Sequence, residues 1–160
     1  AYFKVYYPKA YYAAYFTVRA SDDFDYECMC KGIDVAKAAI REIQAKGQDA
    51  TAKDKSKQTV LESIVEFYAR GFQFEPIDLY RSQASKFTVT ESGLLPPFSS
   101  MQGLGVTAAE SIVAARESGG EFHTIEELKA RTSLGRSLID MLKENGVLQG
   151  IPETNQLSLF

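Results

Sequence analysis

The amino-acid sequence predicts a mainly α-helical protein: a helical bundle segment, a short β-hairpin, a second helical unit built around glycine turns, and a flexible C-terminal tail. Apolar residues recur at helical spacing up to about residue 70. Phe72 and Phe74 then alternate with polar residues up to Pro76, which indicates extended chain. The pair Gly103 and Gly105 opens a new helical pattern. With 45% hydrophobic and 24% charged residues, the composition is that of an ordinary globular protein.

Several classes of protein are excluded. No apolar run approaches the roughly 18 residues of a membrane span, and the N-terminus lacks the charged head and apolar core of a signal peptide. We therefore expect a cytoplasmic protein with no membrane partner. The chain opens on Ala1 rather than Met, in a run that reads like the middle of a protein, so we expect a piece of a longer polypeptide.

Neither a metal site nor a catalytic centre is predicted. Cys28 and Cys30 are separated by one residue, whereas zinc ligands are usually about two to four residues apart, and His123 is the only histidine. We expect two reduced thiols, and a surface or capping role for His123. The sequence has no nucleophile–base pair and no GxxxxGK loop, so we assign no catalytic residue and no cofactor.

The first twenty residues are rich in aromatic side chains. Phe3, Tyr7, Tyr11 and Tyr15 repeat every four residues, which places them on one face of a helix, and Pro8 is expected to start a second helix. Such a stripe beside lysines could stack on bases, but aromatic stripes more often pack a helix bundle. We expect a packing role.

Three helices are predicted next. Ser21–Asp23 reads as the N-cap of a short helix that ends at Gly32, and further helices are expected at 33–46 and 54–69, with a polar connector at 48–57. The predicted buried faces are Val35, Ala36, Ala39, Ile40 and Ile43, and then Val60, Leu61, Ile64, Val65 and Tyr68. We expect Lys53, Lys55 and Lys57 to form a solvated face rather than a DNA contact.

The domain boundary is predicted near residue 75. The β-type run 87–90, the turn 91–93 and Leu94-Leu95 indicate a short hairpin. The predicted division is a helical domain at 1–74, a second domain at 75–150 and a tail at 151–160.

Gly103-Leu104-Gly105 is the central feature of the second domain. Glycine lets backbone amides approach a ligand closely, and Thr107 reads as the N-cap of the helix that follows. A helix N-terminus favours an anion, so we expect a phosphate-binding hairpin, and hence nucleic acid.

A second helical pair echoes this hairpin. Thr124 and Glu127 form a capping box for a helix to about Arg131, and a turn at 132–135 leads into a helix that ends at Asn145-Gly146. Because its glycine pattern is poorer, we expect a packing role for this second turn.

Four stretches of the chain resemble one protein family, in the family's order. Ala1–Pro8 with Tyr12–Thr17, and Glu75–Ser82, resemble the end of the fingers region of C-family bacterial replicative polymerases. Gly103–Arg116 resembles a helix-hairpin-helix motif. Gln156-Leu157-Ser158-Leu159-Phe160 looks like the peptide with which bacterial proteins bind the sliding clamp. The chain is most similar to the PolC-type DNA polymerase III alpha subunit of Gram-positive bacteria, over essentially all 160 residues.

The resemblance implies an inactive part of a DNA-directed DNA polymerase, with the catalytic carboxylates and their Mg²⁺ elsewhere in the parent. It implies four partners or contacts: duplex DNA, the sliding clamp, the upstream domains of the polymerase, and phosphate at the hairpin. The implied DNA-binding residues are Gly103, Leu104, Gly105, Val106, Thr107 and Arg116, with Arg131 and Arg136 as supporting cations. The implied clamp-binding residues are Gln156, Leu157, Ser158, Leu159 and Phe160.

Two alternatives stay open. One is a helix-hairpin-helix adaptor of a repair or RNA-associated protein. The other is a small independent enzyme, which no motif in the sequence supports. A net charge of −3 argues against a strongly basic DNA-binding domain, so we expect weak, sequence-independent DNA binding by this chain alone.

Overall fold

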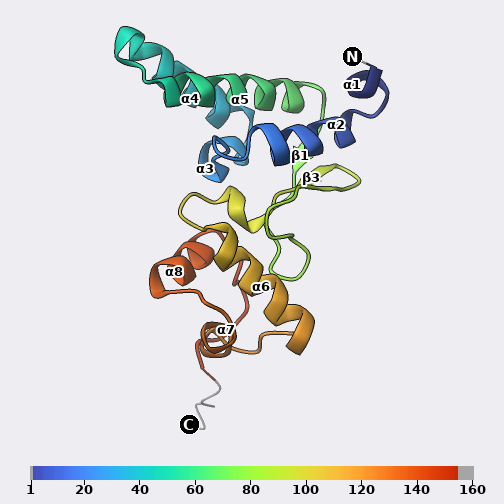
Figure 1. Ribbon diagram of the computed structural model, residues 1–160, viewed down its shortest axis with the longest axis vertical. Helices are drawn as coiled ribbons and strands as arrows, with labels where there is room; N and C mark the ends of the chain where they lie inside the picture. The colour runs from blue at the N-terminus through green and yellow to red at the C-terminus, as the bar shows by residue number, and fades with distance from the viewer. Residues whose placement is uncertain (1, 155–160) are drawn as a thin grey trace.

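The computed structural model describes residues 2–154, which form two helical units joined by a small sheet. The unit built from the earlier helices occupies one end of the molecule, and α6, α7 and α8 occupy the other (Figure 1). The elements are α1 (Tyr2–Tyr6), α2 (Pro8–Ala14), the π-helical turn η1 (Tyr15–Arg19), α3 (Tyr26–Met29), α4 (Ile33–Ala45), the 3-10 turn η2 (Gly47–Asp49), α5 (Ala52–Ala69), β1 (Gln73–Phe74), β2 (Thr88–Val89), β3 (Gly93–Leu95), the 3-10 turn η3 (Phe98–Ser100), α6 (Val106–Gly119), α7 (Ile125–Arg131) and α8 (Arg136–Glu144). None of the described helices is long and apolar enough to cross a membrane.

Pro8 begins α2, as predicted, and the expected packing role holds for half of the aromatic stripe, because Tyr11 and Tyr15 are half-buried and pack against a hydrophobic core. Tyr12 and Phe16 are the buried aromatic residues here, at 1% and 0% exposure. Phe3 and Tyr7 are exposed, and they contact each other on the outside. Tyr12 and Phe16 belong to α2 and the π-helical turn, and both contact Phe67 of α5, whereas Phe3 and Tyr7 lie before α2.

The short helix α3 is capped by Asp25, and the predicted cap at Ser21–Asp23 is wrong. The Asp25 carboxylate accepts a hydrogen bond from the Glu27 amide at 3.1 Å, whereas residues 21–23 form a turn before it. Lys53 and Lys57 of α5 pair with Asp23 and Asp25 at 3.4 and 2.9 Å. These lysines therefore neutralise the acidic segment that precedes α3.

Helices α4 and α5 pack against each other over most of their length (Figure 1). Thr51 caps α5 in a reciprocal capping box with Asp54, so the helix starts two residues before the predicted position. The buried residues are Ala36 and Ile43 from α4, and Val60, Leu61, Ile64 and Phe67 from α5. Phe67 is missing from the predicted face, and Val35 proves 40% exposed.

The predicted hairpin forms, and a third strand adds to it. β2 and β3 pair antiparallel, with Val89 opposite Leu94. β1 pairs parallel to the other edge of β3, so Gln73 lies opposite Gly93. A Cβ atom at Gly93 would clash with the Gln73 backbone, so glycine is required for this pairing.

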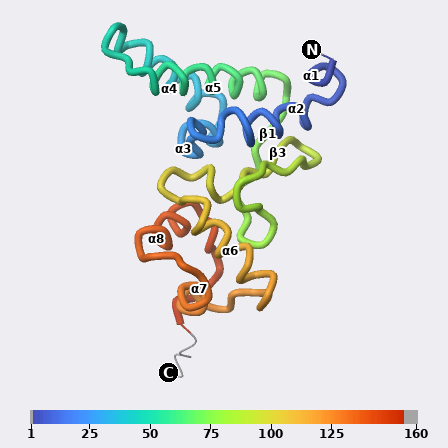
Figure 2. The backbone as a smooth tube through the Cα atoms, viewed as in Figure 1, coloured from blue at the N-terminus to red at the C-terminus, as the bar shows by residue number. Residues whose placement is uncertain are grey.

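Two hydrophobic cores result. We call the core among the earlier helices the first core and the core among α6, α7 and α8 the second core. The segment between β1 and α6 connects the two helical units (Figure 2). Phe87 and Leu94 come after residue 75 but pack in the first core, and Tyr26 packs in the second. The boundary near residue 75 stays a prediction, because side chains on both sides of it cross between the two cores.

Candidate nucleic-acid interface

The turn before α6 places exposed glycines above a buried leucine. Gly103 has a φ of +93°, a conformation that L side chains rarely adopt. Leu104 is 2% exposed and packs in the second core, and its amide donates to the Met101 carbonyl at 3.1 Å. The backbone of Gly105 is extended, with φ −75° and ψ 168°, and leads directly into the helix. Leu104 therefore anchors the hairpin, and any ligand would meet the backbone of the glycines.

The first turn of α6 has amides without protein acceptors. Its first internal hydrogen bond runs from the Ala109 amide to the Gly105 carbonyl at 3.0 Å. Within residues 2–154, the amides of Gly105, Val106, Thr107 and Ala108 donate to no protein group. The first three of these residues are exposed. Such a helix end carries partial positive charge and favours an anion such as phosphate.

Thr107 is not the N-cap of this helix, contrary to prediction. Gly105 holds that position, and no side chain among residues 2–154 caps the helix. The helix starts early because the positive φ of Gly103 and the burial of Leu104 turn the chain before Thr107 is reached. Thr107 is instead the second helical residue, exposed to solvent.

The turn before α8 repeats this geometry. Gly135 occupies the N-cap with φ −80° and ψ 173°, again without a side-chain cap. Leu134 before it is 4% exposed, and the Ile139 amide donates to the Gly135 carbonyl at 3.1 Å. The second hairpin therefore combines packing with an open helix start. A leucine–glycine pair just before an amphipathic helix is the signal in the sequence that could have indicated this.

Helix α7 differs from α6 and α8 because its N-terminus is occupied. Thr124 accepts a hydrogen bond from the Glu127 amide at 2.9 Å, as the predicted capping box requires. The other half of the predicted box is wrong, because it requires Glu127 to accept from the Thr124 amide. Glu127 instead accepts from the His123 amide at 3.0 Å, one residue earlier. The carbonyls of Pro152 and Glu153 then accept the first two amides of α7. Of the three helices in the second unit, α7 has no start open to an anion.

Arg116 lies at the other end of α6 from the hairpin and is used within the fold. Its guanidinium donates to the Leu79 carbonyl at 3.0 Å and lies 5.9 Å from the ring centre of Phe98. Burial lowers the pKa of Arg116 below its ordinary value. A DNA contact by Arg116 stays a prediction, and it would have to use the nitrogen atoms that these contacts leave.

The two supporting arginines have different surroundings. Arg131 donates to the carbonyls of Ala115, Gly120 and Glu121 at 2.6 to 3.0 Å, and also pairs with Glu127. Arg136 is exposed at the start of α8 and has no partner among the described residues. Arg136 is therefore better placed than Arg131 to meet a phosphate.

The cysteines form no ligand cluster in the described part of the chain. Burial raises the pKa of Cys28 to about 11 and that of Cys30 well above its ordinary value. Residues 2–154 contain no group of three His, Cys, Asp or Glu side chains that could hold a metal ion. The predicted clamp-binding residues Gln156–Phe160 lie outside the described residues.

Comparisons with known proteins agree with this geometry. A family model described as a helix-hairpin-helix motif matches residues 71–157. Over all 160 residues, the chain is 52% identical to the PolC-type DNA polymerase III of Caldanaerobacter subterraneus subsp. tengcongensis, and 48% and 47% identical to those of Bacillus subtilis and Clostridium perfringens. The chain spans about 11% of the length of these relatives. The resemblance to this polymerase family is thus confirmed, and the chain belongs to the helix-hairpin-helix family as a homologue of one segment of PolC-type DNA polymerase III.

Proposed function

We propose that this chain is the part of a bacterial replicative DNA polymerase that grips the nascent duplex through phosphate contacts. The observation that carries the proposal is the group of four amides at the start of α6 that have no acceptor in the described part of the chain, held above the buried Leu104. The family match over residues 71–157 includes this hairpin. A phosphate oxygen accepts hydrogen bonds from such amides whatever the base sequence, which suits a replicase.

The electrostatics favour a weak grip by this chain alone. Residues 96–150 contain 5 basic and 7 acidic side chains, so few counterions would be released on binding. Strong binding would then depend on the rest of the polymerase. The polymerase activity and its Mg²⁺ ions would also belong to that larger protein. This chain spans only about 11% of the length of its relatives. The similarity to polymerases extends over all 160 residues of this chain, which supports this role over that of a repair adaptor.

A charge placed at the start of α6 tests the DNA contact. The variant Thr107→Glu puts a carboxylate at the second helical position, where it stabilises the helix but repels phosphate. We expect the dissociation constant for duplex DNA, measured by fluorescence anisotropy at low salt, to rise about tenfold. The thermal midpoint should stay the same or rise.

Ala114→Glu is the matched control, because Ala114 is exposed in the middle of the same helix. It adds the same charge without approaching the amides. Val106→Pro gives an independent test: proline is tolerated at the first helical position, yet it removes one amide donor. Duplex binding that responds equally to Thr107→Glu and Ala114→Glu would overturn the assignment.

We propose separately that Gln156–Phe160 tethers the polymerase to the sliding clamp. The support is the sequence alone: three large apolar residues, Leu157, Leu159 and Phe160, within a polar segment. Burial of Leu159 and Phe160 would contribute roughly 1.5–3 kcal/mol each, part of which is offset by ordering the segment. We expect a dissociation constant on the order of micromolar. Deletion of 156–160 should abolish clamp binding in surface plasmon resonance, and retained binding would refute the tether.

A further inference from the structure

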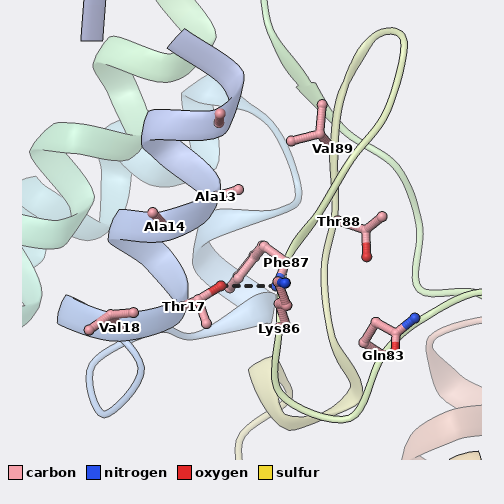
Figure 3. Close-up of a pocket in the computed structure, with 10 residues that line it drawn as sticks. Ala13, Ala14, Thr17, Val18, Gln83, Lys86, Phe87, Thr88 and Val89 are labelled. Atoms are coloured by element: carbon pink, nitrogen blue, oxygen red, sulfur yellow. Dashed lines mark hydrogen bonds between the residues drawn. The ribbon is translucent and has the colours of Figure 1, made fainter. Parts of the chain in front are cut away.

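Two hollows lie between the first unit and the segments that follow it in the chain, and the first of them reaches the start of α6. The first, which we call the junction cleft, has a volume of about 360 Å³ and is lined by Thr17, Ser21, Asp22, Ser85 and Ser99, together with the first residues of the α6 hairpin. The second is a groove of about 860 Å³ between α2–η1 and the 83–89 segment. Thr17 lines both hollows, and Figure 3 shows it in the second one, beside Phe87.

The junction cleft is rich in hydrogen-bond donors. The Thr17 hydroxyl oxygen accepts the Phe87 amide at 3.0 Å, drawn as the dashed line in Figure 3, which leaves its proton to donate. Within the described part of the chain, the hydroxyls of Ser21, Ser85 and Ser99 have no hydrogen-bond partner. Four residues with hydroxyl groups, from three separate segments, therefore line one small space. A ligand that only accepts hydrogen bonds, and accepts several, fits this space best.

Lys86 is the cation next in sequence to the cleft residue Ser85, and it lines the second groove, beside Thr17, rather than the cleft itself (Figure 3). It is exposed, and it forms no ion pair with any carboxylate among residues 2–154. Lys9 of α2, by contrast, is fixed by the carbonyls of Thr90 and Glu91 at 2.8 and 3.0 Å. Asp22 is the one acidic side chain in the lining of the cleft, and it would oppose an anion there.

We propose that the junction cleft holds a second phosphodiester of the DNA strand whose first phosphate lies at the start of α6. Gly105 and Val106 line the cleft, so a strand that leaves their amides enters it directly. Thr17, Ser85 and Ser99 donate hydrogen bonds to the phosphate, and Lys86 neutralises part of its charge. The DNA footprint therefore extends from the second unit onto η1 of the first. This inference rests on the proposed duplex-binding function.

The salt dependence of binding tests the inference in the full chain. One lysine–phosphate contact contributes about 0.9 to the slope of log K against log salt concentration. We expect Lys86→Ala to lower that slope by about one and to weaken duplex binding about fivefold, equally for different sequences. Lys55→Ala is the control: Lys55 is also exposed and without an ion pair among the described residues, but it lies on α5, outside both hollows. An unchanged slope in Lys86→Ala would overturn the proposal.

Two further variants separate the hydroxyl contacts from the general charge. The double variant Ser85→Ala with Ser99→Ala should weaken binding about threefold to tenfold without altering the net charge, because it removes two donors. Asp22→Asn should tighten binding about threefold, because it removes the opposing carboxylate. If the parent chain fails to bind duplex DNA, the proposed function itself is wrong. If the parent chain binds DNA and Thr107→Glu weakens that binding, but none of the cleft variants changes it, only the cleft assignment is wrong.

Discussion

Leu104 and Leu134 occupy equivalent positions in two hairpins: each is buried directly before the glycine that begins the next helix. The glycines that follow them have nearly the same backbone conformation, and neither helix has a side-chain cap. The two buried leucines therefore anchor the starts of α6 and α8 to the second core. Stability and the proposed DNA binding would thus depend on neighbouring residues of the same turn, which can be changed one at a time.

Leu104→Ala should destabilise the fold strongly. It removes a 2% exposed side chain from the second core, and such substitutions cost about 2–5 kcal/mol through lost burial and the cavity that remains. Urea denaturation followed by circular dichroism measures the loss. Val106→Ala, at a side chain that is 49% exposed two residues later, should change the free energy of unfolding by less than about 0.5 kcal/mol. Equal effects of the two substitutions would contradict the anchoring role of Leu104.

Arg131 and Arg136 should separate stability from DNA binding. Arg131→Ala leaves the carbonyls of Ala115 and Gly120 without their donor, so we expect a loss of about 1–3 kcal/mol in the free energy of unfolding. Arg136→Ala should leave stability unchanged and lower the salt slope of duplex binding by about one. Chemical denaturation and anisotropy titrations on both variants check the contrast, and a reversed pattern would refute it.

The sequence could predict the elements but only part of their packing. Local signals were sufficient where a residue acts on its own neighbours, as Pro8 does at the start of α2. The parallel pairing of β1 with β3 could not be predicted, because Gln73 and Gly93 meet through tertiary contacts rather than local pattern. The burial of Tyr12 and Phe16 could not be predicted either, because it depends on their contact with Phe67 of α5.

The candidate site followed the same rule. The glycine hairpin was predictable, because a positive φ and an open helix start depend on a few adjacent residues such as Gly103. The roles of Arg116 and Arg131 were not, because their acceptors are backbone carbonyls that only the folded chain brings near. The junction cleft was also hidden, since Thr17 and Ser85 are far apart in the sequence.

The contact between α1 and α5 should weaken in acid. Glu66 accepts from the Lys4 ammonium at 2.8 Å and from the Tyr12 hydroxyl, which lowers the pKa of Glu66 below 4.5. A lowered folded-state pKa stabilises the fold above the unfolded value and loses that contribution as the pH falls through the folded value. The contribution is at most about 1 kcal/mol, because solvent screens the pair.

We therefore expect the free energy of unfolding to fall between about pH 5 and pH 3, and to fall less in Glu66→Gln. Denaturant titrations at pH 7 and pH 3.5 measure the difference. Glu62→Gln, one turn earlier on the exposed side of α5, should retain the full decrease seen in the parent chain. If Glu66→Gln and the parent lost the same stability, the acid sensitivity would have to arise elsewhere.

The start of the C-terminal tail should contribute to the stability of the fold, whereas its end should not. The Pro152 and Glu153 carbonyls accept the Ile125 and Glu126 amides at 2.9 and 3.1 Å, and Ile151 packs on the second core. Truncation after Ile151 removes both acceptors from the start of α7, so we expect a loss of about 1–2 kcal/mol. In a chain of this size, that lowers the thermal midpoint by about 2–8 °C.

Truncation after Thr154 is the matched variant, because it keeps both acceptors and removes residues 155–160 only. Its thermal midpoint by differential scanning fluorimetry should match that of the parent chain, while its clamp binding is lost. Comparison of the two truncations would then separate the stabilising role of the Pro152 and Glu153 carbonyls from the role of the proposed clamp peptide. Equal melting of the two truncations would mean that water replaces the two carbonyls at the start of α7 without loss, and that the anchor contributes no stability.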